Sequence, residues 1–129
     1  MDVLLDTHVA LWTVGKTSRV PKAIRDLLLH PRTRVHVSVV NVWEIAIKKA
    51  LGKRSQPSLN AAQARSAFVA AGYLMLDVTA EHAIEVERLP LLHHDPFDRL
   101  LIAQAMVEPL RLITHDALVA SYSPTFIQF

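Results

Sequence analysis

The chain has 129 residues, of which 51% are hydrophobic, no cysteine and a formal net charge of +2. These values predict one folded domain over residues 1–129 and exclude a disordered chain, a disulfide framework and thiolate chemistry, while the charge by itself indicates no polyanionic partner. Because no apolar run reaches the roughly 18 residues of a membrane-spanning helix, and Asp2 and Asp6 stand where a signal peptide carries positive charge, we expect a cytoplasmic protein away from the membrane.

Short apolar segments of strand length alternate with helical patterns along the chain. Strands are expected, in chain order, over residues 1–5, 35–40, 73–78, 110–114 and 125–129. Helices are expected over residues 8–14, 21–29, 39–51, 60–71, 80–89 and 96–108, so the second strand could turn into a helix at its end. Ser38 and Thr79 are plausible N-caps, Gly52 and Gly72 mark helix ends, and residues 52–60 are the one obvious loop.

This alternation predicts an α/β fold, a three-layer α/β/α sandwich with a mainly parallel central sheet. No internal repeat, low-complexity tract or linker divides the chain. In open parallel sheets, ligands bind outside the carboxyl ends of the strands. The residues that follow each predicted strand are therefore the first candidates for a functional site.

Four acidic residues from separate segments are predicted to meet at this edge of the sheet. Asp6 directly follows the first strand, and Asp116 follows the strand over residues 110–114. Glu44 lies at the margin of the apolar stripe of its helix, and Asp98 lies in the first turn of another. Converging carboxylates repel one another, and Mg²⁺ or Mn²⁺, which prefers oxygen ligands, removes that repulsion. Taken together, the four acids predict a divalent-metal site.

Taken singly, each of these acids also has a purely structural explanation. Asp6 or Thr7 could cap the helix that follows, and Asp116 could sit in a first helical turn and favour its dipole. Glu44 has Lys48 four residues further on, at a spacing that stabilises isolated helices. The position of one acid in the sequence leaves both explanations open.

The stretch "HHDPFDR", residues 93–99, raises the same question within seven residues. Asp95 is a good N-cap because Pro96 occupies the next position. Asp98, three residues after Asp95, could reach back to the backbone of Asp95 as in a capping box. The alternative is that Asp95 starts the helix while Asp98 holds a metal ion.

The histidines give a weaker signal than the acids. No H-E-x-x-H or comparable zinc spacing connects them, so we expect no structural zinc site, and surface or supporting positions for His93 and His94. His8 and His115 each lie beside a candidate acid and could touch a substrate phosphate.

Basic and aromatic residues leave two alternatives each. A basic group could meet phosphates or could form a solvated helix end. It comprises Lys48, Lys49, Lys53 and Arg54, with Arg32 and Arg34 upstream. Trp12 and Trp43 stand at helical spacing, which favours the core, with a place in the active-site groove as the alternative.

Four motifs, in this order and spacing, resemble a known family. "LLDTHVALW", "SVVNVWEIAIKK", "HHDPFDRLLIAQA" and "RLITHD" are similar to those of PIN-domain ribonucleases, above all the VapC-type toxins of bacterial toxin–antitoxin pairs. The resemblance covers essentially the whole chain. It implies a PIN-like fold and an endoribonuclease (a hydrolase) that cuts RNA with Mg²⁺ or Mn²⁺.

The resemblance also implies roles for particular residues and partners. The family's acidic positions fall on Asp6, Glu44, Asp98 and Asp116, which would be both catalytic and metal-binding, with Asp6 and Asp98 as primary ligands. Glu44 and Asp116 would complete the site directly or through water, around one ion or two. The cut would leave a 5′-phosphate and a 3′-hydroxyl. The implied partners are an RNA substrate, a cognate antitoxin and a second copy of the chain in a homodimer.

Other classes of protein agree less well with the sequence. A haloacid-dehalogenase-like phosphatase needs Asp-x-Asp after the first strand, and the residue two beyond Asp6 is His8. A receiver domain needs paired acids at that place, which "LLDTH" lacks. A non-catalytic PIN-like module that binds RNA or protein remains the alternative, favoured only if one of the four acids were missing.

Overall fold

The computed structural model of the chain describes residues 1–52 and 57–129. Its elements, in chain order, are β1 (Asp2–Leu5), α1 (Thr7–Val14), the 3₁₀ turn η1 (Thr17–Arg19), α2 (Lys22–Leu29), β2 (Arg34–Ser38), α3 (Val39–Leu51), α4 (Ala61–Ala70), β3 (Leu74–Leu76), α5 (Ala80–Arg88), α6 (Pro96–Val107), β4 (Arg111–Thr114), α7 (Ala117–Ala120) and β5 (Ile127–Gln128). No helix in the described ranges is long and apolar enough to cross a membrane.

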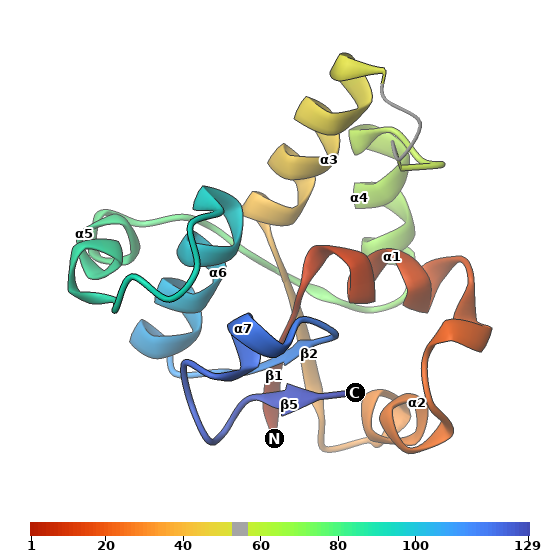
Figure 1. Cartoon of the computed structure of the whole chain (residues 1–129). Coiled ribbons are helices and arrows are strands. Elements are labelled where there is room, and N and C mark those ends of the chain that lie inside the picture. Colours follow the sequence, from red (N-terminus) through yellow and green to blue (C-terminus); the bar gives the residue numbers. More distant parts are fainter. Residues whose placement is uncertain (53–56) are drawn as a thin grey trace.

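The strands form one sheet in the order β3-β2-β1-β4-β5, and every pair is parallel. β1 lies at the centre, where Leu4 is in register with His36 of β2 and Leu112 of β4. The carboxyl ends of these strands therefore meet at one edge, and α1, α3, α6 and α7 gather around it (Figure 1). The mainly parallel sheet predicted from the sequence is confirmed.

Helices cover both faces of the sheet. Val3 and Leu5 of β1 pack into a core with residues of α1, α2 and α4, while Leu4 packs into a second core with residues of α6 and α7. Alternate residues of a strand point to opposite faces, so a strand covered on both sides is apolar throughout. Figure 1 shows the two helical layers on either side of the sheet, which confirms the three-layer sandwich.

The segment predicted as a strand over residues 35–40 turns into a helix at Ser38, the N-cap expected from the sequence. The Ser38 hydroxyl accepts the backbone N–H of Val40 at 2.9 Å, and the Asn41 side chain accepts the N–H of Ser38 at 2.6 Å. This reciprocal cap starts α3 at once, so Val39 and Val40 are helical despite their β-branched side chains. The helix ends at Gly52, which has a φ of 63°, in the left-handed region that favours glycine.

Several other predicted bounds were too generous. The strand expected over residues 73–78 is reduced to β3, and the last edge strand is only β5. The short element η1 was not expected, and for α7 the sequence offered only a helical turn at Asp116, because three or four residues carry no helical periodicity. Part of the loop predicted over residues 52–60 lies outside the described residues.

Candidate active site

The four predicted acids line one cleft at the carboxyl edge of the sheet. Its volume is about 470 Å³, and its walls come from α1, η1, α3, α6 and the residues just before α1, α6 and α7. The lining residues are Asp6, His8, Trp12, Arg19, Glu44, Lys48, Asp95, Asp98, His115 and Asp116. The parallel topology therefore brings the four acids together, as the sequence predicts.

Asp6 is buried directly after β1, with 7% of its surface exposed. It stands at the N-cap position of α1, but its side chain makes no capping hydrogen bond, so that structural explanation is wrong. Its Oδ2 instead accepts the Thr114 hydroxyl at 2.6 Å. Burial raises the pKa of Asp6, and the hydrogen bond from Thr114 only partly opposes this rise.

Glu44 is more deeply buried, at 3% exposed, and both of its oxygens have donors. The Thr7 hydroxyl donates to Oε1 at 2.7 Å, and the Lys48 ammonium donates to Oε2 at 2.5 Å. Asn41 in turn donates to the Thr7 hydroxyl at 2.8 Å. Partial burial disfavours the charge of Lys48, but the bond to Glu44 outweighs it and raises the pKa of Lys48. The predicted Glu44–Lys48 pair is confirmed, and it lies inside the cleft.

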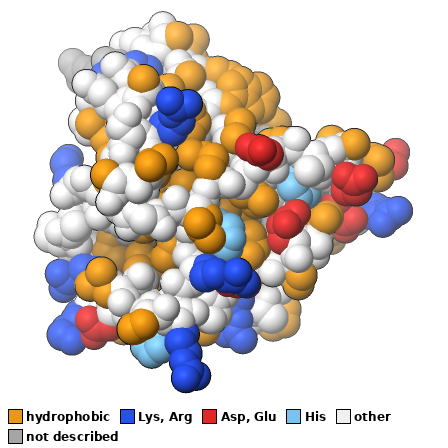
Figure 2. Space-filling model, turned by 180° about the vertical axis from the view of Figure 1, so that it is seen from behind, with side chains coloured by type: hydrophobic (Ala, Val, Ile, Leu, Met, Phe, Trp, Pro, Cys, Tyr) orange, Lys and Arg blue, Asp and Glu red, His pale blue; other side chains and the backbone are white. Residues whose placement is uncertain are grey.

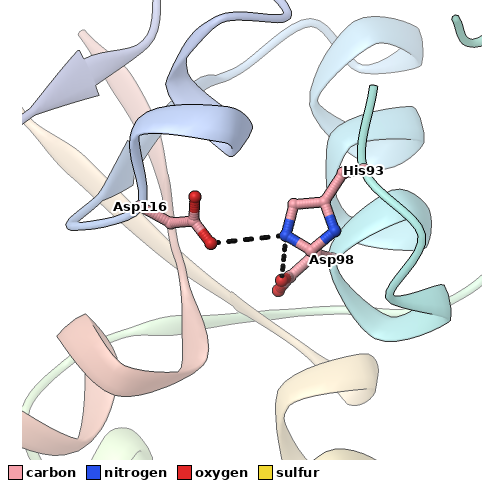
Figure 3. Close-up of side chains that lie close together, drawn as sticks. All are labelled: His93, Asp98 and Asp116. Carbon is pink, nitrogen blue, oxygen red and sulfur yellow. Dashed lines mark hydrogen bonds and ion pairs between the residues drawn. The ribbon is translucent and has the colours of Figure 1, made fainter. Parts of the chain in front are cut away.

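The Asp98 and Asp116 carboxylates both approach the same nitrogen of the His93 ring. The ring nitrogen Nε2 lies 3.0 Å from Oδ2 of Asp98 and 3.3 Å from Oδ2 of Asp116 (Figure 3). Burial, followed by repulsion from neighbouring carboxylates with Asp6 the largest contributor, raises the pKa of Asp98 to about 8. The Asp98 carboxyl therefore takes up a proton near neutral pH unless a cation replaces that proton.

Asp116 has a structural role as well as a place in the cleft. Its Oδ1 caps α7 by accepting the backbone N–H groups of Leu118 at 2.8 Å and Val119 at 3.4 Å. Slight burial opposes ionisation, but these bonds and the one from His93 outweigh it and lower the pKa of Asp116. Oδ2 is turned to the cleft. The structural explanation is therefore confirmed for Oδ1, while Oδ2 stays available for the metal site that the sequence predicts.

His93 is the residue of this site that sequence reasoning placed only in a general supporting position. Its Nδ1 accepts the backbone N–H of Asp95 at 3.1 Å, which assigns the proton of a neutral ring to Nε2. That Nε2–H is then the donor to Asp98 and Asp116. The Tyr122 hydroxyl accepts the backbone N–H of His93 at 2.9 Å and fixes the loop. His93 thus holds two carboxylates in place.

Asp95 starts α6, as predicted. Its Oδ1 accepts the backbone N–H of Phe97 at 2.8 Å and that of Asp98 at 3.1 Å. The back-bond expected from Asp98 is not made, because the N–H of Asp95 donates to the His93 ring and Asp98 points to the cleft. The capping-box alternative for Asp98 is therefore wrong.

The two tryptophans lie in different environments. Trp12 packs against the core beneath α1, as predicted, and its remaining surface lines the cleft. Trp43 is 50% exposed on α3 and meets the Phe97 ring edge-to-face at 4.9 Å. The core position predicted for Trp43 is wrong.

The four basic residues of this group that the structure describes do not form one patch. Lys48 lines the cleft, whereas the Lys49 ammonium donates to the backbone carbonyl of Pro57 at 3.0 Å. Arg32 and Arg34 lie at the opposite end of the sheet, where Arg34 pairs with Asp2 at 2.7 Å. The predictions for Lys53 and Arg54 fall outside the described residues.

The donor set in the cleft suits a hard divalent cation. One ligand atom each from His93, Asp98 and Asp116 lies within 4.8 Å of the others, and Asp6 and Glu44 add carboxylates in the same cleft. Burial, with repulsion from neighbouring carboxylates, raises the pKa values of Asp6 and Asp98, so each carboxyl favours a proton or a cation beside it. Carboxylate oxygens are the ligands that Mg²⁺ and Mn²⁺ prefer. The residues present therefore fit the ion that the resemblance implies.

Comparisons with known proteins agree on the fold. The structure of VapBC2 from Rickettsia felis bound to a promoter DNA fragment matches at a TM-score of 0.69 and 16% identity, over 100% of this chain and 98% of that one. DNA-bound VapBC from Salmonella typhimurium matches at 0.65 and 17%, over 100% and 97%. VapBC-1 from nontypeable Haemophilus influenzae matches at 0.63 and 20%, over 100% and 97%.

Sequence comparisons add the family. A search of curated proteins gives no match. The family model of the PIN domain matches residues 3–122, which include the four acids of the cleft, His93 and all of the described helices. The chain therefore belongs to the PIN domain family.

Proposed function

We propose that this protein is a cytoplasmic endoribonuclease that depends on Mg²⁺ or Mn²⁺ and acts as the toxin of a toxin–antitoxin pair. The observation that carries the proposal is the convergence of Asp6, Glu44, Asp98 and Asp116 in one cleft with too little positive charge beside them. The matches to VapBC structures support the toxin part of the proposal.

Under this proposal the four acids have unequal roles. Asp6 and Asp98 are the primary ligands, because burial and neighbouring carboxylates raise their pKa values and a cation offsets both effects. Glu44 and Asp116 complete the site directly or through water. A bound divalent ion would act as a Lewis acid toward the phosphate oxygens and toward the attacking water. Hydrolysis of the phosphodiester then leaves a 5′-phosphate and a 3′-hydroxyl.

Neighbouring side chains keep these acids in position. The Thr114 hydroxyl fixes Asp6, the Thr7 hydroxyl fixes Glu44, and the Nε2–H of His93 spans Asp98 and Asp116. Preorganised donors of this kind spare the site a rearrangement when substrate binds. Lys48, paired with Glu44 in the cleft, is also available to the charge of a phosphate.

An antitoxin and a second copy of the chain are the proposed protein partners. The helix α3 exposes a row of apolar side chains that a folded monomer leaves in water: Val39, Trp43 and Leu51 are 39%, 50% and 60% exposed. Apolar side chains also gather over the upper part of the molecule seen from behind, the end that carries α3 and α4 (Figure 2). Acidic side chains gather instead on the side of α5. Exposed apolar areas of this kind are typical of protein interfaces.

A cleavage assay tests the proposal. The purified chain, free of any partner, is incubated with total cellular RNA in Mn²⁺ or Mg²⁺, with EDTA and the variant Asp98→Asn as controls. We expect metal-dependent cleavage that the folded variant loses. A wild-type protein that binds both the metal and RNA without cutting the RNA would instead be the non-catalytic module. If the protein binds neither Mg²⁺ nor Mn²⁺, the four acids have only structural roles and the proposed function is wrong.

A further inference from the structure

One wall of the cleft is aromatic and basic, in contrast to its acidic floor. Trp12 of α1 forms the centre of this wall. The Arg19 guanidinium lies over the Trp12 ring, with Cζ 5.4 Å from the ring centroid. The His115 ring meets Trp12 edge-to-face at 5.5 Å, and the His8 ring lies tilted at 6.1 Å. All four side chains line the same cleft as the acids.

Trp12 also borders a second hollow on its other side. This hollow has a volume of about 350 Å³ and includes His8, Trp12 and Lys16 in its lining. No acid is among its described lining residues, so the charge changes from negative to positive along the path that passes Trp12. A polyanionic strand that runs from the acidic cluster in this direction would contact Arg19, Trp12 and Lys16 and would meet no carboxylate among the described lining residues of this hollow.

Packing alone does not account for this arrangement. Trp12 does contact the core and the Phe129 ring, whose centroid is 6.2 Å away. Core packing explains the buried part of Trp12, but it does not explain why an arginine of the cleft lining lies over the Trp12 ring. Single-stranded nucleic acid is bound by this combination, in which bases stack on aromatic rings or guanidinium planes while cations meet the backbone.

We propose that Trp12 and Arg19 form a stacking site for one unpaired nucleobase next to the phosphate that is cut, with Lys16 meeting the strand beyond it. This inference rests on the proposed function and names its substrate class, which is single-stranded or looped RNA. A base inside a duplex keeps its neighbours and cannot reach the ring. His8 and His115 border the same base from α1 and from the turn before α7.

The chain offers a direct spectroscopic test, because Trp12 and Trp43 are its only tryptophans. Trp43→Phe leaves Trp12 as the sole indole. Ca²⁺ replaces Mg²⁺ during titrations to keep the charge of the site, and each RNA is checked for integrity afterwards. The probes are a random-sequence single-stranded RNA 12-mer, an abasic strand of equal charge and a 12-base-pair duplex.

We expect the single strand to quench Trp12 fluorescence and the abasic strand and duplex to leave it nearly unchanged. Stacking of one base is worth about 1–3 kcal/mol, so Trp12→Leu should weaken binding of the single strand roughly tenfold or more. The matched variant Trp43→Leu, on α3 outside the cleft lining, should stay within about twofold. Trp12→Phe keeps an aromatic ring and should retain most of the affinity. Should Trp12→Leu fail to fold, the difference in affinity between the single strand and the abasic strand, measured on the Trp43→Phe protein, decides the matter.

Equal affinity for the abasic strand, or full affinity of a folded Trp12→Leu protein, would overturn the stacking site. So would quenching by an antitoxin segment with none by RNA, because Trp12 would then serve a protein partner. These binding measurements involve no cleavage. If the protein binds RNA through Trp12 but cuts no RNA, this inference holds and the proposed nuclease activity is wrong. If the protein cuts RNA but Trp12 contributes nothing to binding, the nuclease activity holds and this inference is wrong.

Discussion

Replacing Asp98 by Asn should make the metal-free protein more stable in alkaline solution, although it removes a residue of the proposed active site. The pKa of Asp98 is raised from 3.8 to about 8 by burial and by the carboxylates around it. Because the folded pKa lies above the unfolded one, folding takes up a proton here. The associated stability is complete below about pH 4 and is lost as the pH rises through 8. The amide side chain of the variant carries no charge at any pH and escapes this loss.

The size of the effect follows from the shift. One pKa unit corresponds to about 1.4 kcal/mol, so the whole shift sets an upper limit near 6 kcal/mol. The side chain is 18% exposed, and its neighbours share the repulsion and can move, which reduces the effect. We expect Asp98→Asn to raise the free energy of unfolding by roughly 2 kcal/mol at pH 9 in EDTA, and by little at pH 5, where the wild-type carboxyl is neutral.

Urea unfolding at pH 5 and pH 9, with EDTA or Mn²⁺, measures this directly. Mn²⁺ should stabilise the wild type at pH 9 and leave Asp98→Asn almost unchanged, because only the native carboxylate cluster binds the ion. The matched variant Asp95→Asn keeps a good helix cap while it removes one of the charges that act on Asp98. A difference between wild type and Asp98→Asn that is the same at both pH values would refute the reasoning.

Three further predictions concern the neighbours and the metal. Thr114→Val keeps the shape of the side chain but removes the hydroxyl that donates to Asp6, so Mn²⁺ affinity measured by calorimetry should fall about tenfold. Thr114→Ser keeps the hydroxyl and should bind Mn²⁺ within about threefold of the wild-type affinity. Equal affinities of the Val and Ser variants would show that the bond does not position Asp6. Asp95→Ala removes the cap of α6 and should lower the free energy of unfolding, measured in urea, by about 1 kcal/mol more than Asp95→Asn does. A smaller difference in this free energy would mean that Pro96 alone starts the helix. Mn²⁺ affinity should rise with pH up to about 8, by at most tenfold per unit, since Asp98 must lose its proton; a flat profile between pH 6 and pH 8 would contradict the raised pKa.

Local patterns in the sequence predict most of the fold, because each depends on neighbouring residues. The periodicity around Ser38 marks the change from strand to helix, and the apolar runs mark strands buried on both faces. The order of strands in a parallel sheet then brings Asp6 and Asp116 to one edge without any knowledge of side-chain contacts. For this reason the four acids could be found from the sequence.

The supporting contacts could not be found in the same way, since they join distant segments. Thr114 and Asp6 are 108 positions apart, and only the β1–β4 register places the hydroxyl beside the carboxylate. The role of His93 depends on a turn in which the N–H of Asp95 bonds back to the ring. A threonine at the end of a strand, next to a candidate acid on the neighbouring strand, is the one signal that could have indicated Thr114.

The central claim is that these carboxylates hold a divalent ion, and a crystal grown with Mn²⁺ tests it most directly. Anomalous scattering locates manganese independently of its neighbours. We expect a peak in the cleft with Asp6 and Asp98 as ligands, Glu44 and Asp116 at most one water away, and Asp95 still bonded to the start of α6. An empty cleft at saturating Mn²⁺, or a peak held by exposed histidines elsewhere, would contradict the account.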